Sequence, residues 1–291
     1  MDNISLKALA KINLGLDVVR RREDGYHEVR MIMQTIHLYD KLEIKKTKEP
    51  GIVITSNLSY VPTNENNLVY KAAKILMDEF NIQEGVSVNL MKRIPVAAGM
   101  AGGSSDAAAM LYGMNQIFDL RLSRKQLMER GVKIGADVPY CLMRGTALAE
   151  GIGEKLTQLP PMVKCPVLIA KPQISVSTKF VYENLKLNDE TVHPDIDQLV
   201  ADIENKDLHA IAGHMGNVLE TVTIPEYPII AQIKERMMKS GAINSMMSGS
   251  GPTVFGLFED EETAQRAYDD MVKSGLAKQI YLTSIYNNRR D

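Results

Sequence analysis

The chain has 291 residues, of which 45% are hydrophobic and 24% are charged, as in an ordinary globular protein. Its formal net charge of -2 gives no overall attraction to nucleic acid or to an anionic membrane, so we expect a small-molecule partner. The sequence has only two cysteines, no signal-peptide pattern and no apolar run long enough to span a bilayer. We therefore expect a cytoplasmic protein without disulfides.

The N-terminal half predicts an antiparallel sheet with helices. Apolar and polar residues alternate over 6–18, Asp24-Gly25 is a typical hairpin turn, and 29–38 reads as the returning strand. The chain then turns helical after residue 66, with Asn66 or Asn67 as the cap. Further strands are predicted at 41–46, 51–55 and 86–90, and helices at 67–80, 105–118 and 124–134, the last with a capping box from Ser123 to Gln126.

Pro160 and Pro161 interrupt the pattern, which predicts two domains, 1–160 and 161–291. The second half predicts a strand from Pro166, then helices, and finally strand, turn, strand, helix and a last strand at 280–285. The helices are predicted near 177–184, 195–221 with a break, and 228–239. Because strands cluster and helices are not strictly interleaved with them, the predicted fold class is α+β.

One stretch of the sequence, PVAAGMAGGSSDAAA from Pro95 to Ala109, is rich in glycine and serine. Gly99, Gly102 and Gly103 allow positive φ and leave backbone amides uncovered. Two serines then lead into a predicted helix, whose N-terminus attracts anions. The stretch therefore predicts a phosphate-binding loop, although it lacks the Gly-Lys-Ser/Thr of a Walker A loop and the context of a GxGxxG dinucleotide motif.

This stretch resembles the phosphate-binding motif of the GHMP kinases, the family of galactokinase, homoserine kinase, mevalonate kinase and phosphomevalonate kinase. AKINLGLDV near the start and SGSGPT (248–253) near the end resemble the two other motifs of that family, so the resemblance covers nearly the whole chain. It implies a two-domain GHMP kinase architecture, with a ribosomal protein S5 domain 2-like N-terminal domain and a ferredoxin-like C-terminal domain. Ala97, Ala98 and Met100 depart from the family pattern, which has glycines and a leucine there.

The resemblance implies ATP as the phosphoryl donor, accompanied by Mg²⁺. Asn67 and Leu68 are implied as part of the adenine wall. The magnesium ligands are left open, because no carboxylate cage is evident and Ser105 is the one loop residue that we suspect. The residues implied to hold the phosphates are Pro95, Val96, Ala97, Ala98, Gly99, Met100, Ala101, Gly102, Gly103, Ser104 and Ser105.

Asp137, in the segment GADVPY, matches the catalytic aspartate of the family, and Lys11 matches its companion. Gly135 and Pro139 predict a turn around the aspartate. The Lys11 ammonium could hydrogen-bond Asp137 and the substrate oxygen, which would favour the developing alkoxide. Asn13 is implied as a substrate contact, and we expect SGSGPT to pack beside the glycine-rich loop.

Within the family, REDGYH and GADVPYC most resemble a kinase that phosphorylates the 2-hydroxyl of a cytidine diphosphate-linked methylerythritol in non-mevalonate isoprenoid synthesis. Tyr26 and His27 are then implied to contact the cytosine, with Tyr182 opposite, or Phe180 if the register differs, and Thr178 as a polar contact. Two alternatives stay open: a GHMP kinase of homoserine or mevalonate type, and a nucleotide-binding regulator without turnover. The presence of both implied catalytic residues argues against the regulator. The sequence does not indicate the oligomeric state.

Overall fold

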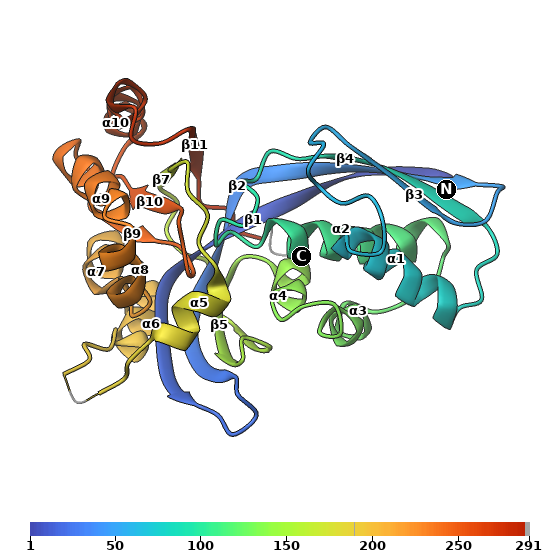
Figure 1. Cartoon of the computed structure of the whole chain (residues 1–291), viewed down its shortest axis with the longest axis horizontal. Helices are drawn as coiled ribbons and strands as arrows, with labels where there is room; N and C mark the ends of the chain where they lie inside the picture. The colour runs from blue at the N-terminus through green and yellow to red at the C-terminus, as the bar shows by residue number, and fades with distance from the viewer. Residues whose placement is uncertain (189, 289–291) are drawn as a thin grey trace. The chain divides into compact units, whose positions relative to one another are not determined.

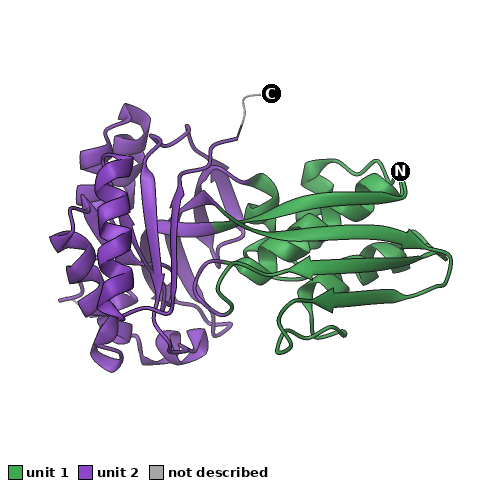
Figure 2. Cartoon of the chain, turned by 90° about the horizontal axis from the view of Figure 1, so that it is seen from above, with its two compact units in different colours: residues 1–10, 38–96, 101–143 green, residues 11–37, 97–100, 144–291 purple. Residues whose placement is uncertain are grey.

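The computed structural model describes residues 1–188 and 190–288 and groups the chain into two compact units (Figures 1 and 2). Two long hairpin strands, β1 (Asn3–Arg21) and β2 (His27–Thr47), contribute to both units, and their predicted turn at Asp24-Gly25 is confirmed. The predicted domain boundary at residue 160 stays a prediction. Unit 1 comprises 1–10, 38–96 and 101–143, and unit 2 comprises 11–37, 97–100 and 144–291.

The sheet of unit 1 has the order β3-β4-β2-β1, with β3 at Ile52–Ser56 and β4 at Gly85–Met91. β4 is antiparallel to β2 but parallel to β3, so the prediction of a purely antiparallel sheet is wrong. The reason lies in the connection, because helix α1 (Leu68–Glu79) joins the two strands as a crossover instead of a short turn.

Four helices cover one face of this sheet (Figure 1). Asn67 caps α1, since its Oδ1 accepts a hydrogen bond from the Val69 amide at 2.9 Å, and the predicted capping box at Ser123 and Gln126 is present. The short α4 was not predicted, and it places Pro139 inside a first helical turn rather than in a loop. The remaining helices are α2 (Gly102–Ile117), α3 (Arg124–Gly131) and α4 (Val138–Met143).

In unit 2, an antiparallel sheet has the order β11-β7-β10-β9, and helices α9 (Ile229–Lys239) and α10 (Glu261–Ser274) pack against it. This confirms the strand, turn, strand, helix and strand predicted for the C-terminal part. The clustering of strands confirms the α+β class. The strands are β7 (Pro166–Lys171), β9 (Asn244–Met247), β10 (Val254–Leu257) and β11 (Gln279–Ser284).

The second halves of β1 and β2 complete unit 2 together with short elements. β5 (Thr146–Gly151) pairs with β2 and with β6 (Lys155–Gln158), and β8 (Gly216–Asn217) pairs with β1 in parallel. None of these three short strands was predicted.

Both cysteines are buried free thiols, and within the described ranges no helix is long and apolar enough to cross a membrane. Besides α9 and α10, unit 2 contains the helices α5 (Thr178–Asn184), α6 (Ile196–Asn205), α7 (Leu208–His214) and α8 (Glu220–Glu226).

Candidate active site

The glycine-rich stretch forms a loop from Pro95 to Ala101 that leads directly into α2. Positive φ occurs at Ala97 (50°), Gly99 (72°) and Ala101 (54°). The prediction of positive φ at Gly102 and Gly103 is wrong, because both are helical. An alanine in the left-handed region costs about 1 to 2 kcal/mol, so the surrounding contacts hold this loop in a strained shape.

The N-terminus of α2 presents uncovered amides. The first helical hydrogen bond runs from the Ser105 amide to the Ala101 carbonyl at 2.8 Å, so the amides of Gly102, Gly103 and Ser104 have no partner within the helix. A Cβ at Gly103 would meet only the Leu68 Cδ1, at 3.5 Å, which brings one predicted adenine contact beside this end. The geometry suits an anion such as a phosphate.

Ser105 and Asn67, two further predicted nucleotide contacts, are occupied by the fold itself. The buried Ser105 hydroxyl donates to the Leu9 carbonyl at 2.7 Å. The Asn67 amide group donates to the Pro62 carbonyl at 2.6 Å while its oxygen caps α1. Their side chains therefore shape the walls, and their roles toward nucleotide and metal stay predictions.

Asp137 lies half-buried immediately before α4, and its carbonyl accepts the Cys141 amide at 3.0 Å, as an N-cap residue does. α4 packs against α2. A Cβ at Gly135 would lie 3.8 Å from the Ser104 Oγ, so the segment that carries the aspartate borders the first turn of α2. Unit 1 thus brings the predicted base to the end of the helix that suits a phosphate.

Beneath the first turn of α2 lies a buried charge cluster that the sequence did not predict. The Lys92 ammonium donates to Asp40 and, at 2.7 Å, to the Asp106 Oδ2. The Asp40 Oδ1 also accepts the amides of Arg93 at 2.5 Å and Ile94 at 2.8 Å. All three charged side chains are at least 90% buried. Burial first, and then repulsion from Asp40, raise the pKa of Asp106 well above its ordinary value.

This raised pKa predicts a pH dependence of stability. Between the unfolded pKa of Asp106, about 3.9, and its higher folded pKa, the folded state binds more protons, so its stability falls as the pH rises. Asp106→Asn should remove this fall in stability with pH. The free energy of unfolding of the variant, measured with urea, should therefore increase relative to that of wild type between pH 4 and pH 8. An equal difference between the two proteins at both pH values would contradict this expectation.

In unit 2, Lys11 and Asn13 form a buried pair on β1. The Lys11 ammonium donates to the Asn13 Oδ1 at 2.8 Å, and the Lys11 amide donates to the Met100 carbonyl of the glycine-rich loop at 3.2 Å. The Asn13 amide group points to the Met31 sulfur at 3.3 Å, and its side chain is fully enclosed. Lys11 is therefore not a solvated strand lysine, and Asn13 orients its ammonium.

The predicted packing of SGSGPT beside the glycine-rich loop is confirmed. The Ser248 hydroxyl donates to the Gly99 carbonyl at 2.9 Å, and a Cβ at Gly249 would lie 3.2 Å from the Gly99 Cα. Asn217, which was not predicted, fixes this second loop by donating to the carbonyls of Met247 at 2.9 Å and Gly249 at 2.8 Å. In unit 2 the second loop thus contacts the glycine-rich loop at Gly99 and is itself held by Asn217.

The predicted base-recognition residues also meet in unit 2. The rings of His27 and Tyr182 lie 5.1 Å apart between centroids, tilted by 39°, whereas Tyr26 is 62% exposed at the hairpin turn. Burial and then Arg21 lower the pKa of His27, so its neutral ring offers one donor and one acceptor. The Thr178 hydroxyl is hydrogen-bonded to the Ser250 hydroxyl of the second loop at 2.8 Å.

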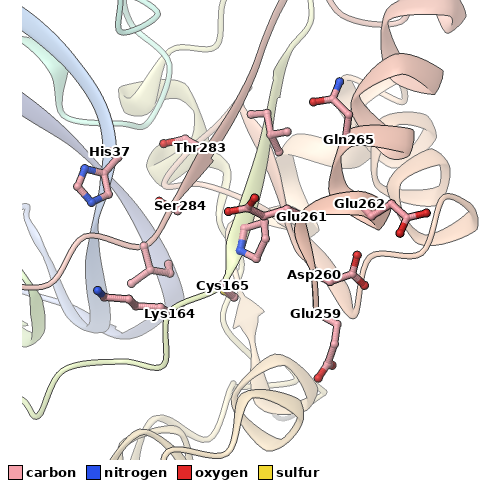
Figure 3. A pocket seen from close by; sticks show the side chains of 13 residues that line it. His37, Lys164, Cys165, Glu259, Asp260, Glu261, Glu262, Gln265, Thr283 and Ser284 are labelled. Atoms are coloured by element: carbon pink, nitrogen blue, oxygen red, sulfur yellow. The ribbon is translucent and has the colours of Figure 1, made fainter.

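A separate cavity of about 780 Å³ in unit 2 is lined by none of these residues. Figure 3 shows His37 and Lys164 on one side of it and acidic side chains from the start of α10 on the other. Its cysteine, Cys165, is not a nucleophile, because burial raises the pKa of the thiol to about 12. The residues that suit phosphate lie in the loops described above.

Family models match two parts of the chain. The description "GHMP kinases N terminal domain" matches residues 67–145, and "GHMP kinases C terminal" matches residues 199–277. The first match contains the glycine-rich loop and Asp137. The second contains α9, β9 and β10 with the loop between those strands.

Two relatives that are similar over nearly the whole chain carry one name. The chain is 58% identical to a 4-diphosphocytidyl-2-C-methyl-D-erythritol kinase of Lachnoclostridium phytofermentans over 99% of both chains, and 57% identical to one of Lachnospira eligens over 98% and 99%. A crystal structure of 4-(cytidine 5'-diphospho)-2C-methyl-D-erythritol kinase superposes with a TM-score of 0.84 at 29% identity, covering 98% of this chain and 100% of the other. Homoserine kinase from Cytophaga hutchinsonii shares the fold, with a TM-score of 0.81 at 22% identity, covering 99% and 96%.

Proposed function

The chain belongs to the GHMP kinases, and we propose that within this family it phosphorylates the 2-hydroxyl of 4-diphosphocytidyl-2-C-methyl-D-erythritol with ATP. The observation that carries this proposal is the 58% identity with a kinase of that name over 99% of both chains. The Tyr26-His27 pair and Tyr182 support it, because a cytosine needs an aromatic surface and polar groups that can read its edge. A cytoplasmic location stays a prediction.

Asp137 is the proposed general base. Phosphoryl transfer needs positioning, neutralisation of charge and a group that takes the proton of the attacking hydroxyl. The Asp137 carboxylate would accept that proton. The Lys11 ammonium, oriented by Asn13, would favour the ionised carboxylate and the developing alkoxide. The amides at the start of α2 would hold the phosphates of ATP, and Thr178 and Asn13 stay predicted substrate contacts.

Magnesium fits this site as a companion of ATP rather than as a caged ion. Within 1–188 and 190–288, no group of three or more His, Cys, Asp or Glu residues could hold a metal. Mg²⁺ is commonly held by substrate phosphates with few protein ligands, and it would neutralise their charge. Ser105 stays the predicted loop ligand, and Asp137 and the Ser104 hydroxyl are further groups that could add ligands.

A panel assay tests the proposed function directly. ATP consumption would be measured with the cytidylylated methylerythritol, methylerythritol alone, homoserine and mevalonate. We expect turnover only with the cytidine diphosphate-linked alcohol. Turnover of homoserine or mevalonate would favour another GHMP kinase, and ATP binding without turnover of any alcohol would favour a regulator.

Tyr26→Ala should raise the KM for the cytidylylated alcohol about 10-fold and leave the KM for ATP unchanged. Stacking of one base on an aromatic ring contributes about 1 to 3 kcal/mol, and this ring is 62% exposed, so its loss costs little stability. Tyr60→Ala is the matched control, since that tyrosine is 66% exposed in unit 1. An unchanged KM in the folded Tyr26 variant would remove the residue from the base site.

A further inference from the structure

The cluster of Asp40, Lys92 and Asp106 lies in unit 1 and holds the segments that precede and follow the glycine-rich loop. Before the loop, Asp40 accepts the amides of Arg93 and Ile94, the last residues ahead of Pro95. After the loop, the Lys92 ammonium donates to Asp106, in the second turn of α2. Because Lys92 also donates to Asp40, one ammonium joins the two ends.

We propose that this cluster is a positioning device for ATP, in which Lys92 sets the first turn of α2 against the start of the loop. The inference rests on the proposed function, since it takes the amides of that turn to be the phosphate donors. The contact is close: a Cβ at Gly102 would lie 3.3 Å from the Lys92 Nζ, so the ammonium lies directly beneath the first residue of the helix. Neither aspartate nor Lys92 touches the phosphates in this role.

The charge of the cluster fits the same role. Asp40 receives three donors, whereas the Asp106 Oδ1 is buried without a hydrogen-bond partner. The raised pKa of Asp106 favours its neutral form, which lessens the negative charge of the cluster. A cluster with less negative charge leaves the positive end of α2 to attract phosphate.

Lys92→Met should raise the KM for ATP on the order of 10-fold, because a displaced first turn misplaces the amides, and misplacement by about 1 Å can cost 100-fold in rate. The KM for the cytidylylated alcohol should stay within about twofold of wild type. Lys41→Met is the control, since that lysine forms an exposed pair with Glu43 on β2 at 2.6 Å. An unchanged KM for ATP in the folded Lys92 variant would overturn the proposal.

A second pair of variants keeps the test decisive if Lys92→Met does not fold. Asp106→Ala removes one end of the bridge and should raise the KM for ATP, whereas Asp106→Asn keeps an oxygen for Lys92 and should restore it. Equal KM values for ATP in these two folded variants would overturn the proposal, because a role in packing alone would show only in their thermal unfolding.

Gly103→Val distinguishes a failure of the proposed function from a failure of the positioning role of the cluster. It covers the amides without approaching the cluster, since a Cβ there meets only Leu68. If calorimetry with ATP shows unchanged affinity, the loop is not the phosphate site and the proposed function fails with it. If this variant loses ATP while Lys92→Met and Asp106→Ala keep it, only the positioning role fails.

Discussion

Asp137→Asn should lower kcat by about 100-fold or more while ATP binding is retained. The amide has the shape of the carboxylate but cannot accept the proton of the attacking hydroxyl. The backbone hydrogen bond of this residue should persist, because its carbonyl accepts the Cys141 amide. The loss should therefore appear in kcat, with unfolding near that of wild type.

Single-turnover kinetics and calorimetry with ATP would separate chemistry from binding. Asp119→Asn is the matched control, because Asp119 is an exposed aspartate of unit 1 that pairs with Arg121 at 3.0 Å. A kcat within a few-fold of wild type for the Asp137 variant would remove this residue from the role of base.

Local patterns predicted most of the elements. The strand at β1, the Asp24-Gly25 turn and the capping box at Ser123 depend on residues close in sequence, and the structure has all three, although residues 8–16 of β1 are buried without alternation. The parallel pairing of β3 with β4 was missed because it depends on how a crossover helix returns the chain. The short strand β8 was missed because its two residues are too few to show a period.

The sequence predicted those parts of the candidate site that one segment forms. It did not predict the contacts between segments that are far apart along the chain. The glycine-rich stretch predicted a phosphate loop. The positive φ at Ala97 and Ala101, in contrast, is imposed by surrounding contacts that no local pattern reveals. Likewise, Lys92 is 52 residues from Asp40 along the chain, and an isolated lysine predicts exposure. A buried lysine is recognisable only when the fold brings carboxylates to it.

Gly102→Val should raise the KM for ATP about 100-fold with little change for the alcohol. A Cβ at this position would lie 3.1 Å from the Ile94 Cγ2 and 3.3 Å from the Lys92 Nζ, closer than ordinary contacts. The γ-methyl groups of valine reach further, so the first turn of α2 or the side chains beneath it must shift, and a misplacement of about 1 Å can cost about 100-fold in rate. The substitution thus acts from beneath the turn rather than by covering its amides.

The matched control is Gly213→Val in α7, where a Cβ would meet nothing within 4 Å. Both variants replace a helical glycine by valine, so they share the same change in helix propensity, which is below about 1 kcal/mol and favours valine. Calorimetry with ATP and the KM for each substrate would be compared between them. Unchanged ATP affinity in a folded Gly102 variant would contradict the expectation that a displaced first turn of α2 loses its hold on the phosphates.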